Sequence, residues 1–530
     1  MVNLKNRIRL MRIYFGFLFF LFSCFQICAE GKHFIFNGES DPETLDPAII
    51  TGVTEMRFVD ALFEGLTTLD PKTLAAKPGV ASSWEIKNKG KEILFHIRAD
   101  ATWSDGTLLR AKDFLYSWKR VLSPETTASY AYQLYPIKNA EKFHKGTIKN
   151  FSKVGVKIIS PLKLSVTLER PCPYFLDLVA FPTLYPVPEH IVKKHAEKWV
   201  RPENIVGNGA FLLKKWEVRQ KIIMEKNPKY WDIKNVKLDR VTGYLYDDKE
   251  TAYKLFLQKK IHWIPSIPET KIDEIIRNPD FYVMPYLGTY FYRFNCKKPP
   301  FDDKRVRKAL SMVIDRSMIT SKILKSGEKP AYFYCPPVAG YKPVKGISNS
   351  IEEAKKLLDE AGYGPGKKKF PKIEILYNTS DSHKKIAEYI SREWRQHLNI
   401  QVDLRNTEWK IFLSEMKSLN FDICRSSWIG DYGDPNTFFD LFVKDGGNNR
   451  TGWFSKKYDA LLKKTQIELD PEKRLKLFNE MEKILVEDEF PIIPIYIYVN
   501  KGMLDESVTG WHQNIRDIHP LKYIDLEIVK

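Results

Sequence analysis

Cysteine and histidine are scarce in this sequence, and their placement excludes several kinds of site. The chain of 530 residues has six cysteines and ten histidines. The cysteines lie far apart, without zinc-ligand spacing, and no H-x-x-x-H or H-E-x-x-H pattern occurs. We therefore expect no metal, no cofactor and no disulfide-built scaffold, while the oxidation state of individual pairs stays open. The cysteines are Cys24, Cys28, Cys172, Cys296, Cys335 and Cys424.

Long apolar runs are missing, apart from a short one near the N-terminus. Residues 1–12 are basic, and residues 13–22 (IYFGFLFFLF) are apolar. Ten apolar residues are too few to span a bilayer, so residues 1–29 are predicted to be a signal peptide. The stretch "LFSC" resembles a bacterial lipoprotein cleavage box and makes Cys24 a candidate lipidation site. Cleavage after Ala29 and a retained membrane anchor are the alternatives.

Motifs for catalysis and phosphate binding are also missing. No G-x-S-x-G sequence occurs, and the glycines of "GYGPGK" lack P-loop spacing and follow a predicted helix instead of opening one. There is no low-complexity tract and no repeat of solenoid period. A chain of this length without such features is expected to form two or three compact domains.

Basic residues are abundant, with a formal net charge of +18. They are spread along helical segments beside acidic residues, as in "DPEKRLKLFNEMEK", instead of forming one basic stripe. A nucleic-acid binder more often has a concentrated stripe or a recognisable motif. A solvated basic surface is favoured, and no nucleic-acid partner is expected.

Local patterns predict a mixed α/β chain. In the first half, an apolar strand over 33–36 precedes a strand pair around a turn at 88–90, and further strands fall at 163–169 and 221–226. A helix is predicted over 110–122, with Phe114, Trp118 and Leu122 on its apolar face.

The second half has the clearest order. One helix is capped by Asp302 or Asp303, and another begins at the capping box of Ser350 and Glu353 and stops at Gly362. Strands and helices then alternate, which implies a parallel sheet with right-handed crossovers. The strands are predicted at 372–378, 400–404 and 421–427, and the helices at 383–398 and 408–419.

Ligands of such sheets lie beyond the carboxyl ends of the strands, so these ends mark a candidate site. The first strand end leads to His383, and the second leads to Trp409. The third leads to Arg425, Trp428 and Asp431. The topology thus gathers a cation, an imidazole, an anion and two large aromatic residues.

An enzyme is one interpretation of this site. Ser426 or Ser427 can be paired with His383 as nucleophile and base. The sequence has no nucleophile elbow and no evident oxyanion glycine beside either serine. We therefore predict no catalytic residues.

A free peptide fits the same residues better. Asp431 can pair the ammonium group, and Arg425 or His383 can take the carboxylate. A strand edge at 425–429 can hydrogen-bond the backbone of an extended ligand. Each backbone bond contributes only about 0.5–1.5 kcal/mol, so several bonds and both charged ends are needed for micromolar affinity.

Longer stretches resemble the family 5 extracellular solute-binding proteins, and within that family the peptide receptors of bacterial ABC transporters. The resemblance covers nearly the whole chain after the signal peptide. It is carried by "VASSWEIKNKGKEILFHIRADATWSDGTLLRAKDFLYSWKRVL", "IVGNGAFLLKKWE", "NPKYWD", "YLGTYFYRFNCKKPPFDDKRVRKALSMVIDR", "EEAKKLLDEAGY", "LYNTSDSHKKIAEYI" and "PIIPIYIYVN".

The resemblance implies an α/β, two-lobed periplasmic-binding-protein (Venus flytrap) fold with an extra inserted domain, three domains in all. A monomer in the periplasm, free or lipid-anchored through Cys24, would enclose short peptides and present them to a membrane permease. The implied divisions are 30–53, 182–287 and 501–530 for lobe 1, 54–181 for the inserted second domain, and 288–500 for lobe 2.

The resemblance also implies roles for individual residues. Asp431 matches the aspartate that pairs the peptide amine, and Arg425 and His383 match groups that meet peptide carboxylates. Ser427 lies on the backbone-pairing strand, and the remaining matches are aromatic pocket walls and one acid. These are Trp409, Trp428, Tyr498, Asp41 and Tyr286.

Two positions depart from relatives. Met416 stands where some relatives have a second arginine, and Gly288 and Ile429 stand where some have a cysteine pair. Each site residue also has a structural interpretation. Asp431 can merely open a turn, Arg425 can pair a structural acid such as Asp422 or Asp440, and His383 can face water. The tryptophans can be core residues.

Alternative ligands stay open, because the fold does not fix the ligand. They are dipeptides, murein peptides, nickel and haem, and a surface adhesin that reuses the scaffold is an alternative of another class.

Overall fold

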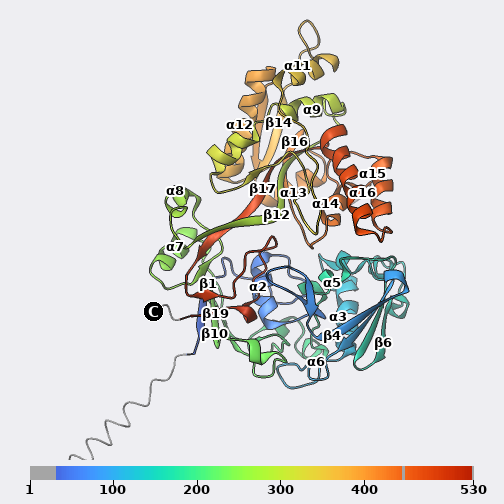
Figure 1. The fold of residues 1–530 in the computed structure, drawn as a ribbon, viewed down its shortest axis with the longest axis vertical. Coiled ribbons are helices and arrows are strands. Elements are labelled where there is room, and N and C mark those ends of the chain that lie inside the picture. The colour runs from blue at the N-terminus through green and yellow to red at the C-terminus, as the bar shows by residue number, and fades with distance from the viewer. Residues whose placement is uncertain (1–30, 445–447, 528–530) are drawn as a thin grey trace, which may run out of the picture.

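The computed structural model describes residues 31–444 and 448–527, so the predicted signal peptide and Cys24 lie outside the described residues. We call residues 288–500 the upper lobe, and residues 31–287 with 501–527 the lower lobe. Figure 1 shows α9, α11, β14 and β16 in the upper lobe and β1, α2, α3 and β4 in the lower lobe. The predicted two-lobed α/β fold is confirmed, whereas the exact division into domains stays a prediction.

One sheet of eleven strands runs through both lobes. Its order is β15-β14-β16-β12-β17-β11-β1-β10-β9-β8, with β13 paired beside β17. The strands are β1 (His33–Asn37), β8 (Phe211–Glu217), β9 (Lys221–Lys226), β10 (Arg240–Tyr244), β11 (Trp263–Ile264), β12 (Phe281–Phe294), β13 (Lys329–Pro330), β14 (Ile373–Asn378), β15 (Val402–Thr407), β16 (Ile423–Ile429) and β17 (Ile492–Leu504).

A separate antiparallel sheet lies in the lower lobe, in the order β4-β5-β7-β6. Its strands are β4 (Ala81–Lys87), β5 (Glu92–Ile97), β6 (Val156–Ser160) and β7 (Lys163–Thr167). The predicted strand pair around 88–90 is therefore present, and the helix predicted beside it is α3 (Ala111–Leu122). Two further two-stranded sheets pair β2 (Thr67–Leu69) with β3 (Ala76–Pro78) and β18 (Val508–Thr509) with β19 (Asp525–Leu526).

The α-helices cover both lobes. The largest hydrophobic cluster of buried side chains lies in the lower lobe, apart from Tyr432, and the second largest lies in the upper lobe. The other helices are α2 (Val53–Leu62), α4 (Ala140–His144), α5 (Phe175–Leu178), α6 (Glu189–His195), α7 (Lys249–Leu257), α8 (Ile272–Ile275), α9 (Lys304–Met312), α10 (Arg316–Met318), α11 (Ile351–Glu360), α12 (Asp381–Leu398), α13 (Trp409–Lys417), α14 (Asn436–Phe439), α15 (Lys456–Thr465) and α16 (Pro471–Lys483).

The predicted parallel βαβαβ unit is present in the upper lobe. β14 pairs in parallel with β15 on one side and with β16 on the other. The caps agree with the prediction, since Ser350 accepts the backbone N–H of Glu353 and Asp303 accepts that of Arg305. The ends differ: α12 begins two residues before position 383, and β15 runs to Thr407 because its pairing with β14 continues to Asn378.

Two long strands, β12 and β17, run from one lobe into the other (Figure 1). They pair with each other along most of their length, with a register shift between Pro285 and Thr289. At this bulge the Leu287 N–H donates to the Ile515 carbonyl, and the Leu287 carbonyl accepts from Gly430. A bulge turns the backbone groups of its residues away from the neighbouring strand. Through these groups, Leu287 joins the C-terminal segment to the end of β16.

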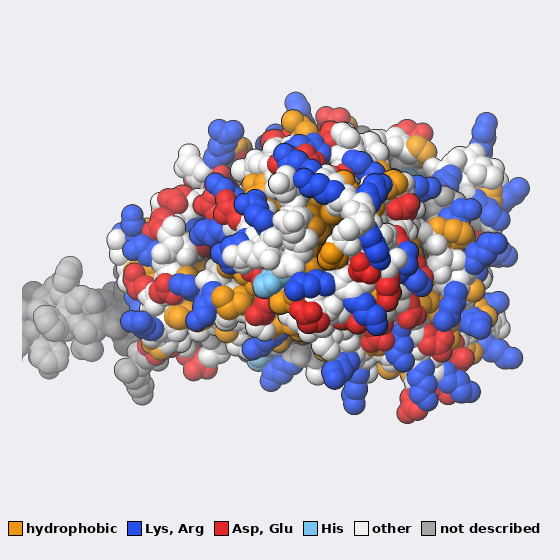
Figure 2. All heavy atoms as spheres, turned by 90° about the horizontal axis from the view of Figure 1, so that it is seen from above, with side chains coloured by type: hydrophobic (Ala, Val, Ile, Leu, Met, Phe, Trp, Pro, Cys, Tyr) orange, Lys and Arg blue, Asp and Glu red, His pale blue; other side chains and the backbone are white. Residues whose placement is uncertain are grey.

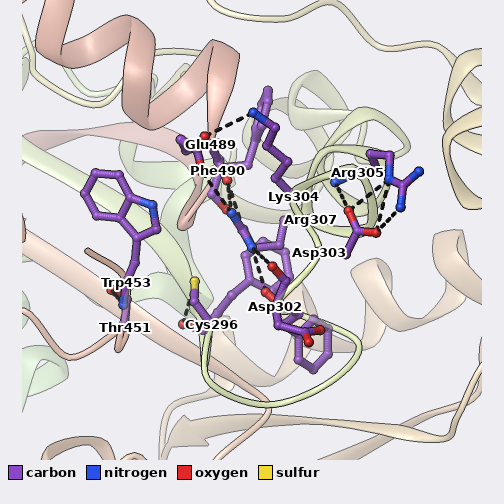
Figure 3. Close-up of polar contacts among 12 residues, drawn as sticks. Cys296, Asp302, Asp303, Lys304, Arg305, Arg307, Thr451, Trp453, Glu489 and Phe490 are labelled. Atoms are coloured by element: carbon purple, nitrogen blue, oxygen red, sulfur yellow. Dashed lines mark hydrogen bonds and ion pairs between the residues drawn. The ribbon is translucent and has the colours of Figure 1, made fainter. Parts of the chain in front are cut away.

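A buried arginine locks one end of this strand pair. Figure 3 shows Arg307, from α9, surrounded by backbone carbonyl groups on two chain segments. Its guanidinium donates to the carbonyls of Phe301 (2.7 Å) and Phe490 (3.1 Å), and also to that of Glu489. The arginine thereby ties the turn after β12 to the turn before β17. This is a structural reason for the arginine in "FDDKRVRKAL".

Charges of both signs are mixed on the face seen in Figure 2, which looks down on the upper lobe. Lysine and arginine side chains alternate there with aspartate and glutamate, as expected for a solvated basic surface. Among residues 31–444 and 448–527, no helix has the length and apolar character needed to cross a bilayer.

Candidate ligand-binding site

A cavity of about 430 Å³ lies between the two lobes. Its lining comes from both: Ser427 to Asp431 belong to the upper lobe, and α2 and the C-terminal segment belong to the lower lobe. The shape is suited to a small or extended ligand that contacts both lobes at once. The lining residues fall within 51–69, 130–132, 180–185, 209–210, 230, 286–287, 427–431 and 516–522.

Asp431 lies in this cavity, two residues beyond the end of β16. Its carboxylate accepts a hydrogen bond from the Tyr132 hydroxyl (2.6 Å), and its backbone carbonyl accepts one from Arg516 (2.9 Å). No cation of the described chain forms an ion pair with the carboxylate. Burial raises the pKa of Asp431 to about 6, against the lowering effect of the tyrosine hydrogen bond and the Arg516 charge. The group is therefore an acid without a counter-ion.

One edge of β16 is open beside this acid. β16 pairs with β12 over its whole length, from Ile423 to Ile429. On its other edge, β14 pairs only with Ile423 and Cys424. Residues 425–429 thus lack a strand partner on that edge within the described chain. An extended ligand can occupy such an edge through backbone hydrogen bonds.

Arg425, His383 and Tyr498 form a second cluster, further along β16 and outside the cavity lining. The Arg425 guanidinium donates to the Tyr498 hydroxyl (3.0 Å) and to Asn378 (3.4 Å), and it lies 4.8 Å from the centre of the Tyr290 ring. No carboxylate of the described residues pairs with it. The structural alternatives fail, since Asp422 pairs with Lys298 and Asp440 bonds neighbours on its own loop.

His383 is neutral at ordinary pH. Burial, and then the charge of Arg425, lower its pKa to about 3. Its Nδ1 lies 3.4 Å from the Tyr290 hydroxyl, so the imidazole does not simply face water. Until a carboxylate arrives, Arg425 alone carries positive charge in this cluster. No hydrogen bond joins His383 to Ser426 or Ser427 in the described residues, and Ser426 instead accepts from Arg293 (2.8 Å).

Of the other predicted site residues, some line the cavity and some do not. Ser427, Trp428 and Tyr286 line the cavity together with Asp431. Asp41 does not, because its carboxylate accepts the indole N–H of Trp216 (2.9 Å) in the lower lobe. Trp409 is the first residue of α13, and its side chain lies outside what the structure describes.

Several cavity residues were not predicted from the sequence. Asp60 comes from the last turn of α2, Tyr132 from a short 3-10 helix (Ala131–Leu134), and Arg516 and Lys522 from the C-terminal segment. In the sequence they look like ordinary solvated residues, and no local pattern marks them.

The lobes also contact each other directly beside the cavity. Asp177 of the lower lobe accepts the backbone N–H of Gly433 (2.7 Å) and pairs with Arg516 (2.6 Å). Tyr174 stacks on Tyr432, with ring centroids 4.3 Å apart and planes 9° from parallel. The structure is therefore a closed form of the two lobes.

Within residues 31–444 and 448–527, no group of three or more histidine, cysteine or acidic side chains is arranged to hold an ion. The four described cysteines are unpaired, and Cys335 and Cys424 are buried.

The positions at which the sequence departs from relatives lie in two different parts of the upper lobe. Met416 is buried in an apolar cluster with Leu376 and Phe421, so it does not reach the cavity. Gly288 stands opposite Ile429 in the pairing of β12 with β16. A β-carbon at Gly288 would lie 2.3 Å from the Ile429 Cδ1, so side chains at these two positions meet next to the cavity.

A closed two-lobed fold with a ligand cavity at the junction defines a solute-binding protein, and the sequence comparison gives the family. The family description "Bacterial extracellular solute-binding proteins, family 5 Middle" matches residues 75–450, and the chain belongs to this family.

Individual relatives match over nearly the whole length. The periplasmic murein peptide-binding protein MppA of Escherichia coli is 36% identical over 499 residues, covering 92% of each chain. The periplasmic oligopeptide-binding protein OppA of Salmonella typhimurium is 37% identical and covers 91% of this chain and 90% of its own. A crystal structure of a periplasmic oligopeptide-binding protein from Borrelia burgdorferi superposes with a TM-score of 0.81 at 35% identity, covering 94% of this chain and all of that one.

Proposed function

We propose that this protein is the substrate-binding receptor of an ABC importer, which captures short peptides in extended form between its lobes and delivers them to a membrane permease. The relatives named above are peptide-binding proteins, and the Borrelia protein is also named for an oligopeptide ABC transporter. Family 5 members are solute-binding proteins, so we propose no catalysis.

One observation carries this proposal: the two ends of an open strand edge hold opposite charges that lack partners. Within the described residues, Asp431, past one end of β16, has no counter-ion, and Arg425, inside the strand, has no carboxylate partner. A peptide in its free form has an ammonium group, an extended backbone and a carboxylate in the same order. Charge-assisted hydrogen bonds at both ends and backbone pairing between them match the open groups.

Binding would be coupled to closure of the lobes. A peptide on β16 would bridge the lobes, because Asp431 belongs to the upper lobe and its partner Tyr132 to the lower lobe. A ligand that contacts both lobes binds the closed form more tightly and shifts the population toward it. The permease would then recognise the closed complex.

The remaining parts of the proposal follow the family. The protein would act in the periplasm as a monomer, without nucleic acid, after cleavage of residues 1–29, and with Cys24 as a candidate lipid attachment point. The peptide contacts proposed are Asp431, Arg425, His383, Ser427, Trp428, Tyr498, Tyr286 and Trp409, and Asp41 is left out because it bonds Trp216.

Native mass spectrometry of the purified protein, followed by calorimetry with di- to pentapeptides, tests this function. Co-purified short peptides, recovered intact after binding, are the expected result and also give the preferred length. A protein that carries no peptide and binds none of the series would refute the proposal. Murein peptides are a second candidate because of the relative named for them, so a cell-wall tripeptide belongs in the same series.

A further inference from the structure

The charges lining the cavity are unbalanced. Three cations line it, and each already has a carboxylate partner. Arg57 pairs with Glu39 (3.0 Å) and Asp517 (2.9 Å). The other two pairs are Arg516 with Asp177 (2.6 Å) and Lys522 with Glu64 (2.7 Å). The cavity therefore offers no uncommitted positive charge among its described residues.

Two carboxylates in the same lining have no cation: Asp431 and Asp60. The partner of the Asp60 side chain is the Tyr185 hydroxyl, which donates to it at 2.9 Å. Burial raises the pKa of Asp60 to about 6, although the tyrosine and the more distant Lys522 and Arg516 charges oppose this shift. Lys522 is committed to Glu64 instead. A purely structural acid at this depth would be expected to hold a counter-ion.

An aromatic wall connects the two acids. Tyr185 bonds Asp60, and Tyr132 bonds Asp431. Between them, the Tyr130 ring lies 5.5 Å from that of Phe181 and 5.7 Å from that of Tyr132. All four aromatic residues line the cavity. Aromatic faces attract cations, and they also pack against the apolar stem of a lysine or arginine side chain.

We propose that Asp60 is a specificity-determining residue, which makes this receptor select peptides with a cationic side chain near their amino end. The inference rests on the proposed peptide-binding function. The α-ammonium group would occupy Asp431, and the second cation would extend along the aromatic wall to Asp60. The peptide carboxylate would lie toward Arg425, outside this cavity. A ligand with two positive groups at one end thus matches two acids without counter-ions.

Calorimetry with paired peptides at pH 7.5 tests the inference. Ala-Arg-Ala and Ala-citrulline-Ala differ by one charge at nearly equal shape. Two further pairs, with arginine or citrulline as the first or the third residue, show which position of the peptide is selected. A charged hydrogen bond corresponds to about 10- to 100-fold in affinity. We expect the wild-type protein to prefer the arginine peptide by at least about tenfold in one position of the series.

The variant Asp60→Asn keeps the shape of the side chain and removes its charge. It should reduce the ratio of the two affinities to about one with both peptides still bound, whereas a misfolded variant would bind neither. Glu55→Gln, on the same helix but outside the cavity lining, should keep the preference.

Each other outcome overturns the inference. Equal affinities for both peptides in the wild-type protein would refute it and leave the proposed peptide function intact. If the Asp60→Asn variant still prefers the arginine peptide, a group other than Asp60 causes the preference, and the inference is wrong. A wild-type protein that binds none of the peptides would refute the proposed function as well.

Discussion

Replacing Asp431 by asparagine gives the sharpest test of how the cavity holds a peptide amine. The amide keeps the shape and can still accept the hydrogen bond of Tyr132. The bound ammonium group loses the anion that faces it, and the lining acids Glu64 and Asp517 cannot replace it because they are already paired with cations. Loss of a charged hydrogen bond costs about 1.5–3 kcal/mol, so trialanine should bind about 10- to 100-fold more weakly.

The pH dependence separates this role from general damage. The pKa of Asp431 is raised to about 6 in the ligand-free protein, and an unperturbed peptide amine titrates near about 8. Only between these values are both groups charged. Affinity for trialanine should therefore fall below pH 6, by up to about tenfold per unit, and again above pH 8.

Isothermal titration calorimetry from pH 5 to pH 9 provides the measurement, with Glu55→Gln as a control for an acid outside the cavity. The Asp431→Asn variant should bind weakly at all pH values and lack the decline below pH 6. A variant that binds as tightly as the wild type would refute the amine-capture role. So would a wild-type affinity that stays constant between pH 7 and pH 5.

Three further results are expected. Arg307→Met should lower the free energy of unfolding in urea by about 2–4 kcal/mol, because buried carbonyls lose their donor; a loss under 1 kcal/mol would contradict the structural role. Burial and the nearby Asp431 raise the pKa of Asp440 to about 7. The free energy of unfolding should therefore fall as pH rises from 4 to 7, because the unfolded chain releases this proton at lower pH than the folded protein does. Asp440→Asn should then stabilise the ligand-free protein by about 2 kcal/mol at pH 8 and not at pH 4, and equal effects at both would be inconsistent with this. Asp177→Asn weakens the inter-lobe hydrogen bond from Gly433. It also frees Arg516, which bonds the Asp431 carbonyl across the lobes, from its ion pair. Small-angle scattering should therefore show a more open ligand-free form, and peptides should bind about three- to tenfold more weakly; an unchanged radius of gyration would argue against a closure role.

The sequence predicted well those features that depend on local chemistry. Ser350 and Asp303 cap helices because their side chains bond the first free N–H groups, which depends only on neighbouring residues. The alternation of strands and helices placed Arg425 and Asp431 at one edge of a parallel sheet. The family resemblance then supplied the second lobe and the idea of closure.

Residues whose role depends on distant partners were harder to predict. Asp41 was assigned to the ligand, yet it bonds Trp216, which lies 175 positions away in the chain. Asp60 was missed for the opposite reason. A carboxylate within an amphipathic helix has the same pattern whether it meets water or a cavity, and only the packing of Tyr185 and the C-terminal segment distinguishes the two.

The strand pair β12 and β17 has a consequence for dividing this molecule into fragments. Each strand contributes to both lobes, and their mutual pairing extends from Phe281 to Arg293. A cut between the lobes would sever both strands and expose unpaired backbone groups, which are prone to edge-to-edge aggregation. The lobes should therefore unfold together in one heating transition, and a biosensor built from this protein needs its reporter groups on surface loops of the intact chain.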